Sequence, residues 1–122
     1  FGTQTASIAV RGAGNNTESW NGSSWTNLPA SVVVFDGGNH GGGTQTAGVV
    51  YGPRTYNATE LWDGTTWATS VRYSTSRGGN NAGDASAGLL VGGFTGSGNS
   101  NATEEFTGET TAARAVKTID FD

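Results

Sequence analysis

Three glutamates recur at one position of an internal repeat and are the first candidates for chemistry. Glu18, Glu60 and Glu104 each lie two residues before an aromatic residue. Residues two apart in a strand share a face, so each glutamate points to the same side as its aromatic neighbour. A catalytic carboxylate pair needs two acidic groups at one site with separated pKa values, whereas these copies fall in successive repeats. We therefore predict a structural role, in which each carboxylate pairs with Arg72, Arg77 or a backbone amide of the neighbouring strand.

Four tryptophans recur in the same repeat and admit two interpretations. Trp20, Trp25, Trp62 and Trp67 could present exposed faces to a sugar, or they could pack inside the protein. A buried aromatic side chain contributes roughly 150–250 Å² to a core. The fixed place of these tryptophans in the repeat favours packing between neighbouring repeats over sugar binding.

His40 is the only histidine and lies in the glycine-rich segment 37–43. Without cysteine or a second histidine, a zinc site within one chain is not expected, and Asp36 with His40 forms no triad without a placed nucleophile. We predict an exposed loop here. Asn39, His40 and Tyr56 are the candidate contacts to a partner or ligand, and no catalytic, metal-binding or cofactor-binding residue and no cofactor are predicted.

The elements that must position these residues are hairpins. Residues 57–67 read Asn-Ala-Thr-Glu-Leu-Trp-Asp-Gly-Thr-Thr-Trp, and 15–25 and 101–111 follow the same pattern. Asn-Gly or Asp-Gly between two β-prone runs supplies the positive φ angles of a tight hairpin turn. A second block, Gly-Thr-Gln-Thr-Ala, occurs at 2–6 and 43–47, with a looser copy from 83. Copies are about 40–44 residues apart, the period of propeller blades.

Within one period we expect four antiparallel strands. Three are 45–51 and the hairpin arms 57–62 and 65–69. The fourth lies near 72–79 or, in the preceding period, near 32–38, where Val32 to Phe35 is strongly β-prone. By this interpretation the chain opens inside a blade, at its second strand. The alternating segment 115–121 predicts a final strand.

The domain organisation follows from this period. The chain is expected to be one domain of about two and three-quarter repeats, 1–41, 42–81 and 82–122. The absence of methionine predicts that the 122 residues are a piece of a longer product. Unpaired edges at either end of such an incomplete propeller invite association, so we expect part of a larger or oligomeric propeller.

Composition narrows the classes of partner. Only 34% of the residues are hydrophobic and 13% are charged, a thin core that repeated layers or partner chains must complete. The net charge of −4 with six basic residues argues against nucleic acid and against an anionic membrane surface. No apolar run approaches the ~20 residues of a membrane span, so no membrane insertion is expected.

Several phrases together resemble a known kind of protein. An apolar strand, a double glycine at 92–93 and a hairpin with an aromatic-Asp pair at 62–63, followed by Trp67, resemble a kelch-type propeller blade. The phrases Gly-Thr-Gln-Thr-Ala and Asp-Gly-Thr-Thr-Trp are more closely similar to kelch-like repeats of tailed-bacteriophage structural proteins of the cyanophage type. The pattern departs from kelch at Arg11-Gly12 and Gly52-Pro53, which stand where a double glycine would be, and at Thr111, which replaces a tryptophan.

This resemblance implies an all-β fold of kelch-like β-propeller blades and a non-enzymatic virion structural protein. A tail fibre, a baseplate component or a capsid-decoration protein on the virion surface would contact other virion proteins and copies of itself. The alternative is a host-surface or carbohydrate-binding adhesin built on the same propeller, with a host-surface glycan as its partner.

Overall fold

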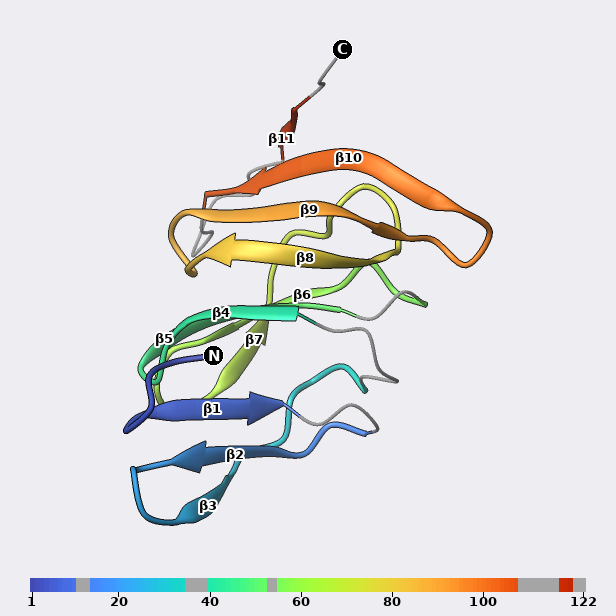
Figure 1. Ribbon diagram of the computed structural model, residues 1–122. Helices are drawn as coiled ribbons and strands as arrows, with labels where there is room; N and C mark the ends of the chain where they lie inside the picture. The colour runs from blue at the N-terminus through green and yellow to red at the C-terminus, as the bar shows by residue number, and fades with distance from the viewer. Residues whose placement is uncertain (11–13, 35–39, 53–54, 108–116, 120–122) are drawn as a thin grey trace.

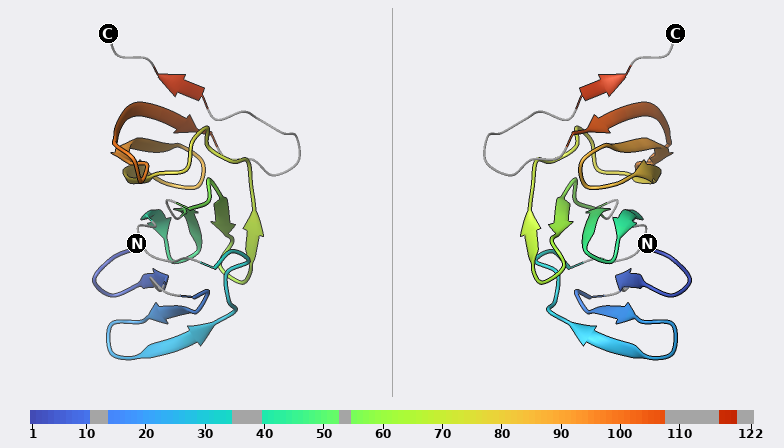
Figure 2. Two further views of the ribbon diagram at one scale, coloured as in Figure 1. Left: turned by 90° about the vertical axis from the view of Figure 1, so that its right-hand side faces the viewer. Right: turned by 90° about the vertical axis from the view of Figure 1, so that its left-hand side faces the viewer.

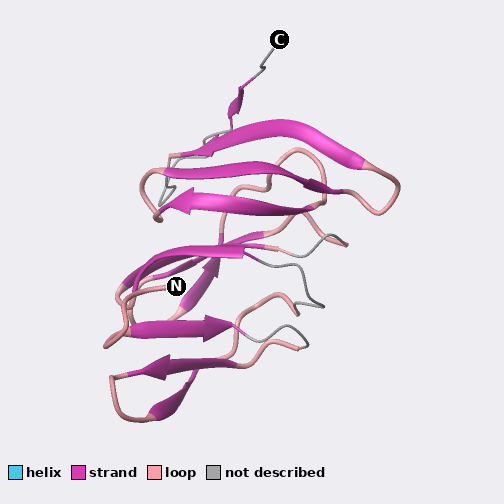
Figure 3. Ribbon diagram, viewed as in Figure 1, coloured by secondary structure: helices cyan, strands magenta, loops and turns pink. Residues whose placement is uncertain are grey.

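The computed structural model describes residues 1–10, 14–34, 40–52, 55–107 and 117–119. Every regular element in these ranges is a β-strand, and the strands form three antiparallel sheets (Figures 1 and 3). The predicted all-β class is confirmed. Among the described residues there is no helix long and apolar enough to cross a membrane.

The sheets follow one another along the chain, and within each the strands are hydrogen-bonded in sequence order. The first sheet contains β1 (Ser7–Val10), β2 (Thr17–Trp20) and β3 (Trp25–Leu28). The second contains β4 (His40–Thr44), β5 (Ala47–Tyr51), β6 (Thr59–Trp62) and β7 (Trp67–Thr69). The third contains β8 (Gly78–Gly83), β9 (Gly88–Phe94), β10 (Asn99–Phe106) and β11 (Lys117–Ile119).

Two of the three predicted hairpins form β2–β3 and β6–β7, and a side chain within each turn holds it; the second arm of the third, in 101–111, lies outside the described residues. Asp63 Oδ1 accepts the amides of Thr65 and Thr66, both at 2.8 Å. Gly64 follows with a φ of 98°, the left-handed region that favours glycine. Asn21 holds the turn of the first sheet in the same way. The Asn-Gly and Asp-Gly signals therefore located both turns, but only the glycine of each has a positive φ, so neither is the tight turn with two positive φ angles that was predicted.

Strand register makes the sheets equivalent position by position. Trp20 lies opposite Trp25 in the first sheet, and Trp62 lies opposite Trp67 in the second. On the preceding strand, Ser7 lies opposite Trp20 in the first sheet. The equivalent pairs are Gly48 with Trp62 in the second sheet and Gly88 with Phe106 in the third. This equivalence allows each residue of one sheet to be compared with its counterpart in the next.

The fourth strand of the repeat lies elsewhere than predicted. Residues 72–77 form no strand, and β8 begins only at Gly78. Val32 to Val34 likewise form a loop, while 35–39 lie outside the described residues. The strands are instead β4 and β8, glycine-rich segments that open the second and third sheets. The expectation of an exposed loop around His40 is therefore wrong for residues 40–43, which belong to β4.

Glycine is required in β4 because two sheets meet there. A Cβ atom on Gly42 would overlap the carbonyl oxygen of Gly83 in β8. Figure 2, which looks roughly along the strands, shows the three sheets fanning away from the side where β1, β4 and β8 lie. A β-branched segment such as 32–35 has the higher strand propensity, but its side chains could not fit this approach.

Two hydrophobic clusters fill the wedges between the sheets. In the first, Ile8 of the first sheet packs with Val50, Trp62 and Trp67 of the second. Val49 is the neighbour of Val50 in β5, and consecutive strand residues point to opposite faces. Val49 accordingly belongs to the other cluster, so the second sheet has a core on both faces.

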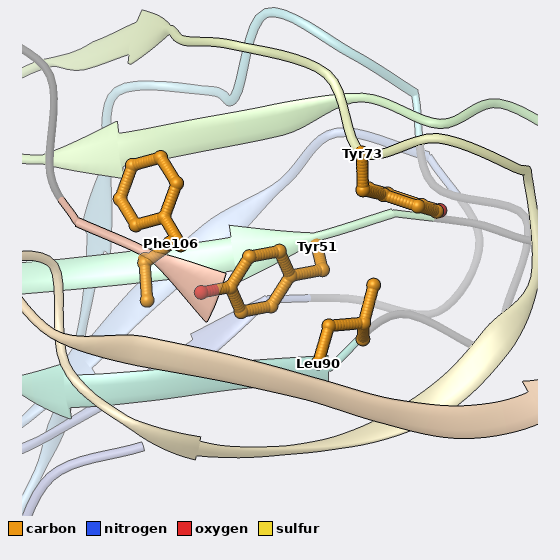
Figure 4. Packing of buried hydrophobic residues seen from close by; sticks show 5 residues of the cluster. Tyr51, Tyr73, Leu90 and Phe106 are labelled. Carbon is orange, nitrogen blue, oxygen red and sulfur yellow. The ribbon is translucent and has the colours of Figure 1, made fainter. Parts of the chain in front are cut away.

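The second cluster lies between the second and third sheets (Figure 4). Tyr51 stands edge-on to Tyr73, with ring centroids 6.5 Å apart, and edge-on to Phe106 at 6.1 Å. Leu90 of β9 completes this cluster together with Val49. Edge-to-face pairs of this kind add to the stabilisation from buried area.

Candidate functional site

The repeated glutamate joins one sheet to the loop that precedes it. Glu60 of β6 is fully buried and accepts the amide of Val32 at 2.7 Å and that of Val33 at 3.0 Å. Glu104 of β10 accepts the amide of Ser74 at 2.7 Å. The predicted structural role is thus confirmed for both glutamates, although the amides belong to linking loops and not to strands.

Glu104 has a cationic partner in addition to its backbone amide. Arg77 Nη1 lies 2.7 Å from Glu104 Oε2, and both side chains are buried. Arg77 Nε also donates to the carbonyl of Gly92 at 2.8 Å, and the guanidinium lies 5.5 Å from the Tyr73 ring centroid. Arg72, the other predicted partner, donates instead to Asn57 Oδ1 at 3.4 Å.

Burial shifts the pKa of Glu60, whose carboxylate accepts two backbone amides. Desolvation raises the pKa of the Glu60 carboxyl, and the hydrogen bonds from Val32 and Val33 offset part of that rise. The carboxylate in turn accepts the backbone amides of Val32 and Val33 and so holds the linking loop. Glu60 and Glu104 therefore act in separate junctions, each fixing the path of one linking loop.

The two tryptophan pairs have the same geometry and opposite exposure. Ring centroids are 5.2 Å apart and tilted by 42° in Trp20–Trp25, and 5.1 Å apart and tilted by 43° in Trp62–Trp67. Trp67 is 7% exposed, and its Nε1 donates to Thr17 Oγ1 of the first sheet at 3.3 Å. Trp25 is 52% exposed. The predicted packing between repeats is confirmed for Trp62 and Trp67 and is wrong for Trp25 in this structure.

Strand alternation explains why the first pair is open. Ile8 points into the junction with the second sheet, so Ser7, its neighbour in β1, points away. Trp20 lies opposite Ser7, and Trp25 opposite Trp20. Opposed residues of antiparallel strands share a face. Both tryptophans therefore stand on the outer face of the first sheet.

The outer face of the third sheet is open by the same reasoning. Leu90 points into the junction with the second sheet, so Leu89 and Val91 point away. Their counterparts in β5 are Val49 and Tyr51, both buried. Val91 is 41% exposed. We call the face with Trp20 and Trp25 the tryptophan face and the face with Leu89 and Val91 the β9 face.

A groove of about 750 Å³ lies between the turn ends of the second and third sheets. Leu61, Trp62 and Ala85 line it, together with Asp63 and Asp84. Asp84 Oδ1 accepts the amides of Ser86 at 2.8 Å and Ala87 at 3.0 Å. The carboxylates of Asp63 and Asp84 are thus both engaged in turns, and Trp62 is almost fully buried. The groove has an apolar wall but no exposed aromatic platform.

The candidate contact residues predicted from the sequence lie apart from both open faces. His40 begins β4 opposite Tyr51, and burial lowers the pKa of its imidazole. Tyr56 lies in the loop between β5 and β6 with its side chain 55% exposed. Within the described residues no hydrogen bond joins His40 to Tyr56. Asn39 lies outside the described residues.

The open faces were missed by sequence reasoning, although a signal was present. Aligning the repeats places Leu89 and Val91 at positions equivalent to Val49 and Tyr51, which the structure buries. Within the described residues no further sheet follows the third. Among the described residues, no group of three or more His, Cys, Asp and Glu side chains is arranged to hold a metal ion.

No family model matches the chain, and no curated protein is significantly similar to it in sequence.

Proposed function

We propose that this chain is a non-enzymatic structural protein of a tailed-phage virion, built of kelch-like propeller blades. It works through protein–protein contacts as part of a tail fibre, a baseplate or a capsid decoration. One observation carries the proposal. The surface that docks one sheet on the next is repeated, and its copy at Trp25 is exposed while its copy at Trp67 is buried.

The buried polar groups support a scaffolding role. Glu60 and Glu104 hold the loops that lead from one sheet to the next, and Arg77 neutralises the second of them. Groups of this kind set the position of rigid layers relative to one another. Such a stack presents large sheet faces to partners, as repeat proteins do.

The experiment is to search for the polypeptide in purified particles of the phage that encodes it. We expect an immunoblot of gradient-purified virions to detect the chain, and immunogold labelling to place it on the particle surface. A polypeptide that remains entirely in the soluble fraction of the lysate would refute the structural role. A capsid protein of the same phage serves as the positive control in both fractions.

An adhesin is the second candidate function, favoured by the exposed ring of Tyr56. An exposed aromatic face can stack on a sugar ring. Binding to a glycan array that is lost in Tyr56→Ala and kept in Trp25→Ala would support this role. Absence of binding to every glycan of the host surface would refute it.

A further inference from the structure

We propose that the tryptophan face of one copy docks on the β9 face of a second copy, head to tail. The inference deepens the proposed structural function, on which it rests, by naming the partner and the residues in contact. It comes from the two junctions inside the chain, which provide a template for a third.

The template is the junction between the first and second sheets. There Trp62, Trp67 and Val50 of the second sheet pack on Ile8 of the first. The outer face of the first sheet repeats the residues that the second sheet contributes to this junction, with Trp20 and Trp25 at the positions of Trp62 and Trp67. The register of β1 and β5 places Ala9 at the position of Val50.

The β9 face repeats the other half of the template. Leu89 stands at the position of Ile8, and Val91 at that of Val10, which also packs in the first junction. Thr103 of β10 stands at the position of Thr17, the acceptor of the Trp67 indole N–H. Thr103 is already buried in the single chain, so Leu89 and Val91 are the residues that this face offers for docking.

The two open faces are complementary halves of one interface, since each is equivalent to a half that is buried inside the chain. Because the halves differ, the contact is heterologous and must either close into a ring or grow into a filament. The described residues of the 122-residue chain form three sheets, so two such chains supply six. Propellers hold roughly four to eight blades, and three copies would exceed that range. A closed dimer with two identical junctions is the expected assembly.

The first test is the molar mass of the 122-residue chain by sedimentation velocity and native mass spectrometry. We expect twice the chain mass of 12.4 kDa. Trp25→Asp and Val91→Asp should each yield folded monomers, because each variant damages both junctions of the dimer. Loss of a buried aromatic anchor weakens association by about 30-fold or more. Tyr56→Asp changes an equally exposed side chain away from both faces and should remain dimeric.

Mixing the two variants separates head-to-tail docking from other arrangements. A dimer of one Trp25→Asp chain and one Val91→Asp chain contains one junction with both changes and one intact junction. We therefore expect the mixture to recover dimer that neither variant forms alone. Retention of the dimer by Val91→Asp, with loss in Trp25→Asp, would mean that two tryptophan faces meet each other, and would overturn the proposal.

A wild-type chain that stays monomeric at high concentration would also overturn it, and would assign the two faces to other proteins. That outcome leaves the virion test untouched, because particles would still contain the chain. Conversely, a dimer that is absent from purified particles would refute the virion role and leave the docking of the two faces established. Circular dichroism of each variant confirms that the sheets are folded.

Discussion

The junction between the first and second sheets and the junction between the second and third use the same glutamate in different surroundings. At the first, Glu60 accepts two backbone amides beside a tryptophan pair. At the second, Glu104 accepts one amide and faces Arg77 beside edge-to-face tyrosine and phenylalanine rings. A buried carboxylate can therefore be compensated by amide dipoles or by a cation, and the two solutions should respond differently to mutation and to pH.

The largest difference between the junctions should appear on removing the cation. Arg77→Ala leaves Glu104 buried without its charge partner, which costs about 3–5 kcal/mol of the free energy of unfolding. Arg72→Ala removes an exposed guanidinium and should change stability by less than about 0.5 kcal/mol. Urea denaturation followed by circular dichroism compares the two variants. A loss below about 1 kcal/mol in Arg77→Ala would show that the second junction does not depend on the ion pair.

The two tryptophan pairs allow a second comparison at identical ring geometry. Trp67→Ala opens a cavity in the first junction and should cost about 3–4 kcal/mol. Trp25→Ala should cost less than about 1 kcal/mol, because half of that side chain is already exposed. Both are best measured in the Val91→Asp background, so that association does not add to the stability of the chain. Equal losses in the two variants would mean that Trp25 is covered in the monomer.

The first junction should depend on pH through Glu60. Burial raises the pKa of this carboxyl above its ordinary value of 4.5, so the folded chain keeps the proton to a higher pH than the unfolded chain. Stability from this group is highest below pH 4.5 and falls as the pH rises through the folded pKa. Glu60→Gln removes this dependence and costs about 1–2 kcal/mol, since one amide loses its acceptor.

The measurement is a series of urea titrations between pH 4 and pH 8 for the wild type and Glu60→Gln. The difference in unfolding free energy between the two proteins should shift across this range. If the wild-type and variant curves run parallel throughout, Glu60 does not titrate in the way that its burial implies.

The smallest effect concerns the two hairpin turns. Hydrogen bonds from the amides of Thr66 and Thr65 lower the pKa of Asp63 to about 2, whereas Asn21 holds the corresponding turn without a charge. Stability from Asp63 is present above its ordinary pKa of 3.8 and is lost as the pH falls through about 2. Asp63→Asn should keep the turn at neutral pH and abolish this acid dependence. Amide chemical shifts of Thr65 and Thr66 during acid titration report it directly, and unchanged shifts in the wild type would contradict it.

Local patterns predicted much of the fold because they act over a few residues. The predicted segments 45–51, 57–62 and 65–69 contain β5, β6 and β7, and the predicted segment 115–121 contains β11. Hairpins are recognisable from sequence since turn residues and alternation specify them without distant partners. The structural role of the glutamates was also predictable, because repetition of one acidic residue spreads it over separate repeats.

Contacts between sheets were decided only by the tertiary structure. Residues 32–34 have the propensity for a strand, but the amides of Val32 and Val33 are held by Glu60, which lies 27 or 28 residues later in the chain. The strand role passes to glycine-rich β4, where Gly42 lets the second sheet approach the third. Neither outcome has a local signal, since both depend on groups distant in sequence.

The sequence by itself determined the repeat, the hairpins and the identity of the residues that dock one sheet on the next. Only the tertiary structure decided which copies of that docking surface are covered, because burial depends on the presence of a neighbouring sheet and not on residue type. Trp25 and Trp67 occupy the same position of the repeat, and each packs against the equivalent tryptophan of its own sheet with the same ring geometry. Trp67 is covered by the first sheet, whereas Trp25 stands on the outer face of the first sheet, where no other described sheet covers it.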